Sequence, residues 1–436
     1  MRIVHLAAGA GVTYCGACAR DAALVRGLLA LGHDVQVIPL YTPLKVDSGQ
    51  ALPTTRIFLG GINAYLQQLF PLFQRTPEFI DRLLDHPALL RWASRCAIRT
   101  RGEDLGPMTI SVLRGKDGRQ SKELRKLLRY LTGAPRPDVV SITNSLLLGI
   151  AVGVKNTLGV PIVCTVQGED AFVMAMPEPY RSQARQLMQE HATTVDLFIS
   201  PSEAYVAIMA AFLDVPRNRF RVVHAGVDVD AYRPAAPRHT DPFTIGYLSG
   251  INPAKGLDLL VEAFRLLVHE RQRDVRLRVA GKALDADYWR TINRRIRSAG
   301  LVSRFEYCGE VDFTRKRDFL HACSLFSVPS RAAEPRGIAA LEAMAAGVPA
   351  VLPDAGVFPE MVALTGGGVL FPLGDATGLA AAIVRLMDNP ESADSLGRAG
   401  AEGVARHYAT ARMAEEMQQT IAGLVSGITC VPAPPE

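Results

Sequence analysis

The chain has 436 residues, of which 48% are hydrophobic and 21% are charged, and its formal net charge is +5 at pH 7. One hydrophobic core rarely serves so long a chain, so we expect about two domains of an ordinary globular protein. No run approaches the roughly 18 apolar residues of a membrane span, which argues against an integral membrane protein.

The N-terminus and the cysteines bear on the cellular compartment. The opening residues lead from one charge into a strand and a glycine loop, without the long apolar core of a signal peptide. The chain has 7 cysteines, an odd number spread over its length, which suits a reducing environment. These features predict a cytoplasmic protein.

Predicted strands and helices alternate along the chain. In the first half, short apolar runs predict strands at 3–6, 34–40, 139–142, 162–166 and 197–199, with helical patterns between them at 20–31, 122–130 and 180–191. In the second half, similar runs predict strands at 244–247, 276–279, 305–307, 325–328 and 350–352. Apolar strands that alternate with helices indicate parallel sheets covered on both faces.

The predicted fold class is therefore α/β, with two Rossmann-like, doubly wound domains that face each other across a cleft. We expect an N-terminal domain at residues 1–225, a proline-rich linker at 226–240 and a C-terminal domain at 241–405. A C-terminal helix and tail at 406–436 are expected to pack back toward the N-terminal domain.

A glycine loop with Gly9, Gly11 and Gly16 follows the first predicted strand. Glycine lets the backbone approach a phosphate or sugar closely, although a tight turn without a ligand remains an alternative. The second strand ends at Tyr41 without the acidic residue that binds a dinucleotide ribose, which argues against a nicotinamide dehydrogenase. No G-x4-G-K-[ST] run exists, so a P-loop is excluded.

Two further clusters lie in the first half. Cys15 and Cys18 form a single C-x2-C pair, and with no second pair to complete a zinc site, two ordinary loop thiols are favoured over zinc or redox chemistry. The segment from Arg91 to Arg129 holds 11 Lys and Arg against 4 Asp and Glu. A solvated basic face and a surface that contacts an anionic membrane both remain open, whereas nucleic acid is not expected because few aromatic residues accompany the charges.

Two glutamates eight residues apart form the most informative motif. Glu334 precedes a Pro-x-Gly turn, and Glu342 lies in the alanine-rich helix that we expect after Gly337, so both acids can face one site. N–H groups at such a helix N-terminus suit a diphosphate, and a carboxylate further along suits a ribose diol. An ordinary capped helix is the alternative, since this spacing also arises by chance.

This pair resembles the E-x7-E motif of the retaining glycosyltransferases of family 4, which have the GT-B fold. The strand and loop at 246–256, the strand and glycine at 277–282 and the segments at 305–311 and 324–330 also resemble that family in order and spacing. The resemblance implies a retaining, metal-independent transfer of a sugar from a nucleotide-diphosphate sugar to an acceptor hydroxyl. It implies no cofactor, and the acceptor is left open as a sugar, a lipid or a small molecule.

The resemblance also assigns roles to individual residues. Lys255 would hold the donor diphosphate and Glu334 would contact the transferred sugar, which makes these two the predicted catalytic residues. The predicted donor-binding residues are Gly11, Gly250, Gly281, Lys282, Val311, Arg336, Gly337, Ile338 and Glu342. Gln167 and Gly16 are predicted to lie on the acceptor or sugar side. Relatives that act on lipids have basic N-terminal domains, which would place the protein at the inner face of a membrane.

Two departures from the family pattern affect these expectations. The phosphate loop of the family carries an arginine where this chain has Gly250, and Arg336, Lys282 or Arg331 would have to supply that charge. Gln167 stands where relatives often have a histidine, and an amide does not titrate. A sugar-nucleotide-binding protein with weak or no transfer, or a sugar-nucleotide epimerase, therefore remains an alternative. The acidic pairs at 228 and 230 and at 285 and 287 are interpreted as linker and turn residues, not as metal ligands.

Overall fold

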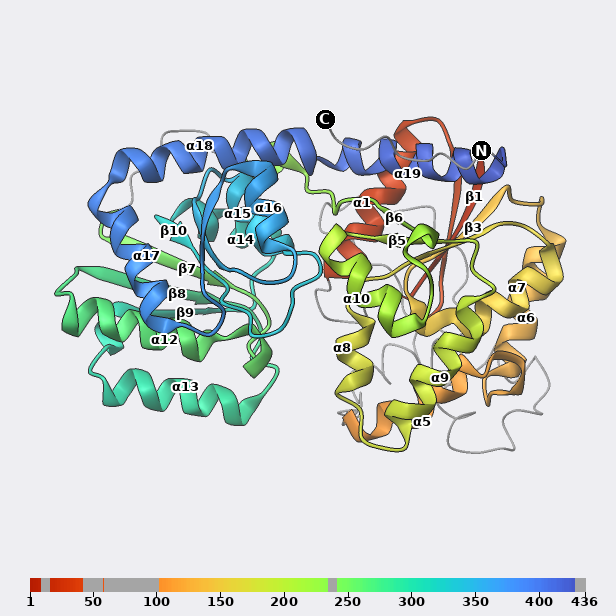
Figure 1. The fold of residues 1–436 in the computed structure, drawn as a ribbon, viewed down its shortest axis with the longest axis horizontal. Coiled ribbons are helices and arrows are strands. Elements are labelled where there is room, and N and C mark those ends of the chain that lie inside the picture. The colour runs from red at the N-terminus through yellow and green to blue at the C-terminus, as the bar shows by residue number, and fades with distance from the viewer. Residues whose placement is uncertain (9–15, 42–57, 59–101, 234–240, 428–436) are drawn as a thin grey trace. The chain divides into compact units, whose positions relative to one another are not determined.

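The computed structural model describes residues 1–8, 16–41, 58, 102–233 and 241–427. Its contacts divide the chain into two compact units (Figure 1). Unit 1 consists of Met1–Val223 together with Met413–Glu436, and unit 2 of His224–Arg412.

Unit 1 contains a parallel six-stranded sheet in the order β2-β1-β3-β4-β5-β6. Its strands are β1 (Arg2–Ala7), β2 (Asp34–Pro39), β3 (Val139–Ile142), β4 (Ile162–Thr165), β5 (Leu197–Ser200) and β6 (Phe220–Val222). Its helices include α1 (Gly16–Ala30), α5 (Gly102–Leu113), α6 (Ser121–Gly133), α7 (Leu148–Leu158), α8 (Glu169–Met174), α9 (Tyr180–Ala192) and α10 (Glu203–Leu213). Helix α1 packs on one face of the sheet, together with buried residues of α19 (Thr410–Val425).

Unit 2 contains a second parallel six-stranded sheet, in the order β12-β11-β10-β7-β8-β9. Its strands are β7 (Phe243–Leu248), β8 (Val275–Ala280), β9 (Phe305–Gly309), β10 (Leu325–Phe326), β11 (Ala350–Pro353) and β12 (Gly368–Phe371). Its helices are α11 (Val229–Tyr232), α12 (Leu257–Arg265), α13 (Ala286–Ser298), α14 (Phe313–His321), α15 (Ile338–Ala345), α16 (Phe358–Thr365), α17 (Ala376–Asp388) and α18 (Pro390–His407). Counted from β7, this order is that of the Rossmann fold, and its direction reverses between β7 and β10.

The predicted fold class, α/β with two Rossmann-like domains, is confirmed. Strands β3, β4 and β11 are buried at every position, as parallel strands covered on both faces must be. The sequence analysis missed β6 and β12. Both strands lie at an edge of their sheet, and most of their residues are only half-buried.

The segment that we expected to be a linker begins inside unit 2. Its first part forms α11, and the Tyr232 side chain of this helix belongs to the core of unit 2. Residues 234–240 lie outside the described part of the chain. Two of the acidic residues that the sequence analysis singled out have structural roles. Asp228 accepts a hydrogen bond from Ala231 N at 3.3 Å, and Asp285 accepts one from Tyr288 N at 2.9 Å. Both residues therefore cap helices, α11 and α13.

Candidate functional site

The candidate site lies in unit 2, where the strand order reverses. The loop at 249–256 follows β7, and the loop at 327–337 follows β10. Strands β7 and β10 are parallel neighbours, so both loops leave the same edge of the sheet. Ligands of doubly wound sheets bind outside the carboxyl ends of the strands at such a reversal.

Gly256 brings these two loops together. It has a φ of +66°, and a Cβ at this position would lie 1.9 Å from the carbonyl oxygen of Pro329. A side chain would therefore push the loops apart, and only glycine permits the contact. Arg331 N also donates to Ala254 O at 2.9 Å, which joins the backbones of the two loops.

Lys255 and Glu334 meet across this junction. The Lys255 ammonium donates to the Glu334 carboxylate, although 79 positions separate the two residues in the chain. The Lys255 side chain is 31% exposed and that of Glu334 is 12% exposed. Asn252 fixes the turn that carries Lys255, because its side chain accepts a hydrogen bond from Ala254 N at 3.0 Å.

Glu334 is held in its ionised form. Burial by itself would raise the pKa of this carboxyl, but the Lys255 ammonium, the Arg336 guanidinium and the Gly337 N–H together hold the pKa below its ordinary value. Gly337 N donates to Glu334 Oε1 at 3.4 Å. At neutral pH this side chain therefore carries a full negative charge beside two cations.

Helix α15 begins at the same place. Gly337 is its N-cap residue with a φ of +62°, and a Cβ there would lie 2.5 Å from Met361 Cε. The helix starts with Ile338, so its first N–H groups point out of the carboxyl edge of the sheet. A helix N-terminus of this kind attracts an anion such as a diphosphate.

Glu342 lies one turn further along α15 and is buried. Its Oε1 accepts a hydrogen bond from the Tyr232 hydroxyl at 2.7 Å and another from Lys316 Nζ at 2.6 Å. The sequence analysis did not foresee Tyr232 or Lys316. Lys316 could have been noticed, because it occupies the helix face that Phe313 and Phe319 mark as apolar.

The remaining predicted donor residues of unit 2 lie at the same edge. Gly281, with a φ of +132°, approaches the loop after β7 so closely that a Cβ would lie 1.9 Å from Ser249 O. Ile251 N donates to Lys282 O at 2.8 Å, and the Lys282 side chain is exposed. Val311 is half-buried in the loop after β9. Gly250 faces Leu284, whose Cδ1 would lie 2.7 Å from an added Cβ.

Of the three cations that could replace the missing arginine, Arg331 and Arg336 have different neighbours. Arg331 is paired with Asp258, which also accepts a hydrogen bond from the Tyr288 hydroxyl at 2.7 Å. Burial opposes ionisation of Asp258, but Tyr288 and Arg331 still lower its pKa. Arg336 acts electrostatically on Glu334, so it is the arginine next to the Lys255–Glu334 pair.

The predicted acceptor-side residues belong to unit 1. Gln167 is buried, and its Nε2 donates to Thr143 O at 2.8 Å, which ties the ends of β3 and β4 together. Glu169 supports this turn, since its Oε2 accepts from Gln167 N at 2.6 Å. Gly16 is the first residue of α1, whereas Gly11 lies outside the described residues.

Several other predictions of the sequence analysis fall on unit 1. Cys18 is buried and Cys15 lies outside the described residues. The basic segment is described from position 102 onward, and there Lys122 and Glu123 are buried, so its charges do not all face solvent. Among the described residues, no cluster of His, Cys, Asp and Glu is suited to a metal ion. No helix in the described ranges is long and apolar enough to span a bilayer.

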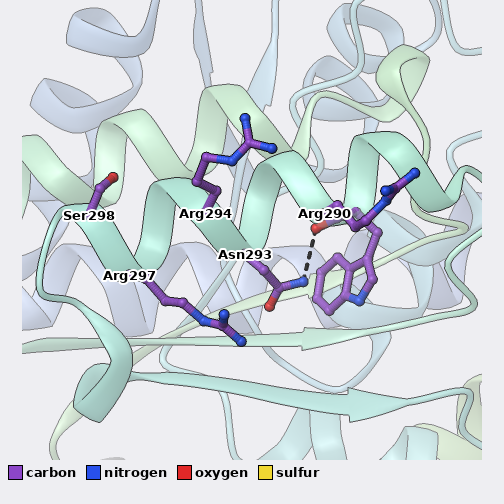
Figure 2. Close-up of a pocket in the computed structure, with 6 residues that line it drawn as sticks. Arg290, Asn293, Arg294, Arg297 and Ser298 are labelled. Atoms are coloured by element: carbon purple, nitrogen blue, oxygen red, sulfur yellow. Dashed lines mark hydrogen bonds between the residues drawn. The ribbon is translucent and has the colours of Figure 1, made fainter.

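A hollow on the surface of α13 contains none of the predicted donor residues. Figure 2 shows this groove on α13, where Asn293 Nδ2 donates to Trp289 O at 2.9 Å. The groove is lined by Trp289, Arg290, Asn293, Arg294, Arg297 and Ser298. Since all six residues come from one helix and none is a predicted donor residue, we do not place the candidate site there.

Comparison with known proteins agrees with this geometry. Residues 228–403 match the model of glycosyl transferases group 1, and residues 105–231 match the model of glycosyltransferase family 4. The structure aligns with that of HepE from Anabaena in complex with UDP, with a TM-score of 0.67 and 16% identity, over 97% of this chain and 100% of the other. The fold and the site thus define a two-domain protein of the GT-B class. The two family matches together span residues 105–403, and with the curated glycosyltransferase relatives they support a GT-B glycosyltransferase of the family 4 type.

Two curated relatives show how far the sequence likeness extends. The chain is 32% identical over 155 residues to a phosphatidyl-myo-inositol mannosyltransferase of Mycobacterium leprae, a match that covers 36% of this chain and 40% of the relative. It is also 32% identical over 212 residues to the lipopolysaccharide core biosynthesis mannosyltransferase LpsB of Rhizobium meliloti, covering 45% and 57% of the two chains. The chain thus spans about half the length of the curated relatives that it matches.

Proposed function

We propose that the protein is a retaining, metal-independent glycosyltransferase that moves a sugar from a nucleotide-diphosphate sugar to an acceptor hydroxyl. The observation that carries this proposal is the contact between Lys255 and Glu334 beside the N-terminus of α15. This arrangement offers a cation and helix N–H groups to a diphosphate, and an ionised carboxylate to the sugar next to it.

Lys255 and Arg336 suit the departure of the diphosphate. When the bond between the anomeric carbon and the phosphate oxygen breaks, its electron pair stays on the oxygen and negative charge grows there. In this proposal the two cations and the start of α15 offset this charge, and such preorganised groups supply several kcal/mol to a transition state. In this proposal a metal ion has no necessary role, because these groups can offset the diphosphate charge.

Glu334 suits the other half of the reaction. Positive charge develops on the sugar as the diphosphate leaves, and a carboxylate held in its ionised form stabilises it. The acceptor oxygen bonds to the anomeric carbon from the face that the diphosphate leaves, which retains the configuration. The acceptor proton passes to the departing phosphate oxygen, so the charges balance.

A screen of sugar nucleotides tests the proposal. Thermal shift against a panel should reveal a donor that stabilises the protein, and UDP sugars come first because HepE was solved with UDP. With that donor, the product should retain the anomeric configuration by NMR, and EDTA should leave the rate unchanged. Inversion or loss of activity in EDTA would overturn the corresponding part of the proposal, and a failure to bind any sugar nucleotide would overturn all of it.

The acceptor and the location form a second part of the proposal. We infer that the protein works in the cytoplasm and contacts the inner face of an anionic membrane through the segment from Arg91 to Arg129. The net positive charge of this segment and the lipid-linked names of two relatives support this inference. Sedimentation with vesicles, described below, tests it.

A further inference from the structure

Arg331 holds the turn that carries Lys255 from both sides. Its backbone N donates to Ala254 O at 2.9 Å, immediately before Lys255 in the chain. Its guanidinium donates to the carboxylate of Asp258, three residues after Lys255. Arg331 belongs to the loop after β10, which also carries Glu334 three positions further along. One residue of the glutamate loop thus grips the lysine turn at two points.

Asp258 is itself fixed by residues of α13. The Tyr288 hydroxyl donates to Asp258 Oδ1 at 2.7 Å and accepts from Asp258 N at 2.9 Å. Burial and the Asp258 carboxylate raise the pKa of Tyr288, so at neutral pH the hydroxyl keeps the proton that it donates. Arg295 lies 3.8 Å from Asp258 Oδ2. We call the three side chains of Arg331, Asp258 and Tyr288 the bracket.

The role of Tyr288 follows from the glycine at the start of α12. This helix begins at Leu257, and its N-cap residue Gly256 offers no side chain to the first N–H groups. A side chain has no room there, because Gly256 lies against Pro329 O. The Tyr288 hydroxyl takes the place of the missing cap by accepting from Asp258 N. The close contact of the two loops thus makes the start of α12 depend on a side chain of α13.

Stability of the fold is a weak reason for the bracket. The Arg331 side chain is 45% exposed, and ion pairs that reach solvent contribute little to stability. The effect of the bracket on geometry is larger, because it joins the two loops on which Lys255 and Glu334 meet. A shift of about 1 Å in a catalytic group can slow a reaction about a hundredfold.

We propose that the bracket positions the Lys255 ammonium against Glu334 for sugar transfer, so that its three members are positioning residues. This inference rests on the proposed function. Without the bracket, a lysine side chain can still reach a bound diphosphate, but it is no longer held where charge grows in the transition state. The value of kcat should therefore fall about ten- to a hundredfold, while the Kd of a nucleoside diphosphate should stay within about threefold.

Arg331→Met tests the proposal at the residue that joins the two loops. Asp258 keeps Tyr288 and Arg295 as neighbours in this variant, so the variant should fold. The value of kcat, followed as release of the nucleoside diphosphate from the donor, should show the expected loss, and calorimetry with UDP should show a nearly unchanged Kd. Arg331→Lys keeps the charge and should recover part of the rate.

The matched control breaks another ion pair of unit 2. Arg273 lies 2.6 Å from Asp388 and is 35% exposed. It precedes β8 and therefore lies at the amino edge of the sheet, opposite the candidate site. Arg273→Met should leave kcat unchanged. A wild-type kcat in Arg331→Met, or the same loss in both variants, would overturn the inference.

A double-mutant cycle distinguishes positioning from a general structural defect. If the bracket acts through Lys255, then Arg331→Met should slow the reaction less than about twofold once Lys255→Ala is present. Tyr288→Phe removes a single hydroxyl, so it should lower kcat at least about threefold in the wild-type background and much less beside Lys255→Ala. A structural defect would instead lower kcat by the same factor in both backgrounds, and that result would refute the inference.

Urea unfolding gives a measurement that needs no substrate. The coupling between Lys255 and Glu334, obtained from Lys255→Ala and Glu334→Gln, should be at most about half as large in Arg331→Met as in the otherwise unchanged protein. An undiminished coupling would overturn the positioning role. If the coupling falls but the wild-type protein binds no sugar nucleotide, the proposed function fails while the bracket itself is upheld.

Discussion

Removing the charge of Lys255 while keeping that of Glu334 gives the sharpest test of the candidate site. Lys255→Ala leaves the Glu334 carboxylate, which is 12% exposed, without the ammonium that contacts it. Breaking a fully buried pair costs about 3–5 kcal/mol and an exposed pair about 0–1. Lys255 is 31% exposed, so we expect a loss of about 2 kcal/mol in the free energy of unfolding. Turnover should fall at least about tenfold, which corresponds to about 1.4 kcal/mol in the barrier.

The double variant Lys255→Ala/Glu334→Gln distinguishes stability from catalysis. With both charges removed, urea unfolding should return close to the wild-type free energy, while the initial transfer rate should stay at least about tenfold low. Arg294→Ala on the surface of α13 serves as the control and should change neither quantity. A double variant that transfers sugar at the wild-type rate would refute the assignment of the site.

The same pair predicts a pH dependence with a definite sign. The pKa of Glu334 is lower in the folded protein than its ordinary value of 4.5, because Lys255 and Arg336 outweigh the effect of burial. The contribution of this carboxylate to stability is therefore fully present above about pH 4.5 and is lost as the pH falls through the lowered value. Compared with Glu334→Gln, the wild-type protein should lose its excess stability in that acidic range. Parallel stability curves for the two proteins would contradict the ion pair.

Three further predictions concern charge at the donor site and in unit 1. Gly250→Arg should tighten sugar-nucleotide binding about ten- to a hundredfold by calorimetry, and the Cβ of the new side chain would meet only Leu284, at 2.7 Å from its Cδ1. Arg336→Ala should weaken that binding by a similar factor, and if it abolishes binding while Gly250→Arg brings no gain, Arg336 already replaces the missing arginine. Sedimentation with acidic vesicles should weaken steeply as salt rises if the segment from Arg91 to Arg129 binds them, and equal sedimentation with neutral vesicles would reduce it to an ordinary basic face.

The sequence predicts the sheets well because inner strands such as β3, β4 and β11 are buried at every position. Ten expected strands correspond to strands of the structure, whereas β6 and β12, two mostly half-buried edge strands, were not predicted. The expected strand at 325–328 ends at Phe326 in the structure, and Ser327 N still donates to Gly246 O of β7 at 2.9 Å. Strand patterns thus locate the edges of the site but not the path of the loops.

The pairing of charges could not be predicted in the same way. Lys255 and Glu334 come together only because β7 and β10 are neighbours, and this adjacency depends on the order of the strands. The partners of Glu342 come from helices 26 and 110 positions away in the chain. The spacing of the two glutamates suggested that Glu342 binds a ligand. That Tyr232 and Lys316 both donate to its Oε1 depends on three-dimensional packing, which the spacing does not reveal.

Helix α19 has a consequence for the synthesis of the protein. Its buried residues Met413, Met417 and Ile421 share a core with Ile3 of β1 and Val35 of β2. These residues follow the whole of unit 2 in the chain, so the ribosome makes them last among the parts of unit 1 that form this core. Until they emerge, one apolar face of the first sheet is incompletely covered, while unit 2 has its complete sequence and can fold first. Nascent chains should therefore present unit 1 to chaperones longer than unit 2, contrary to the usual order in which the N-terminal domain folds first.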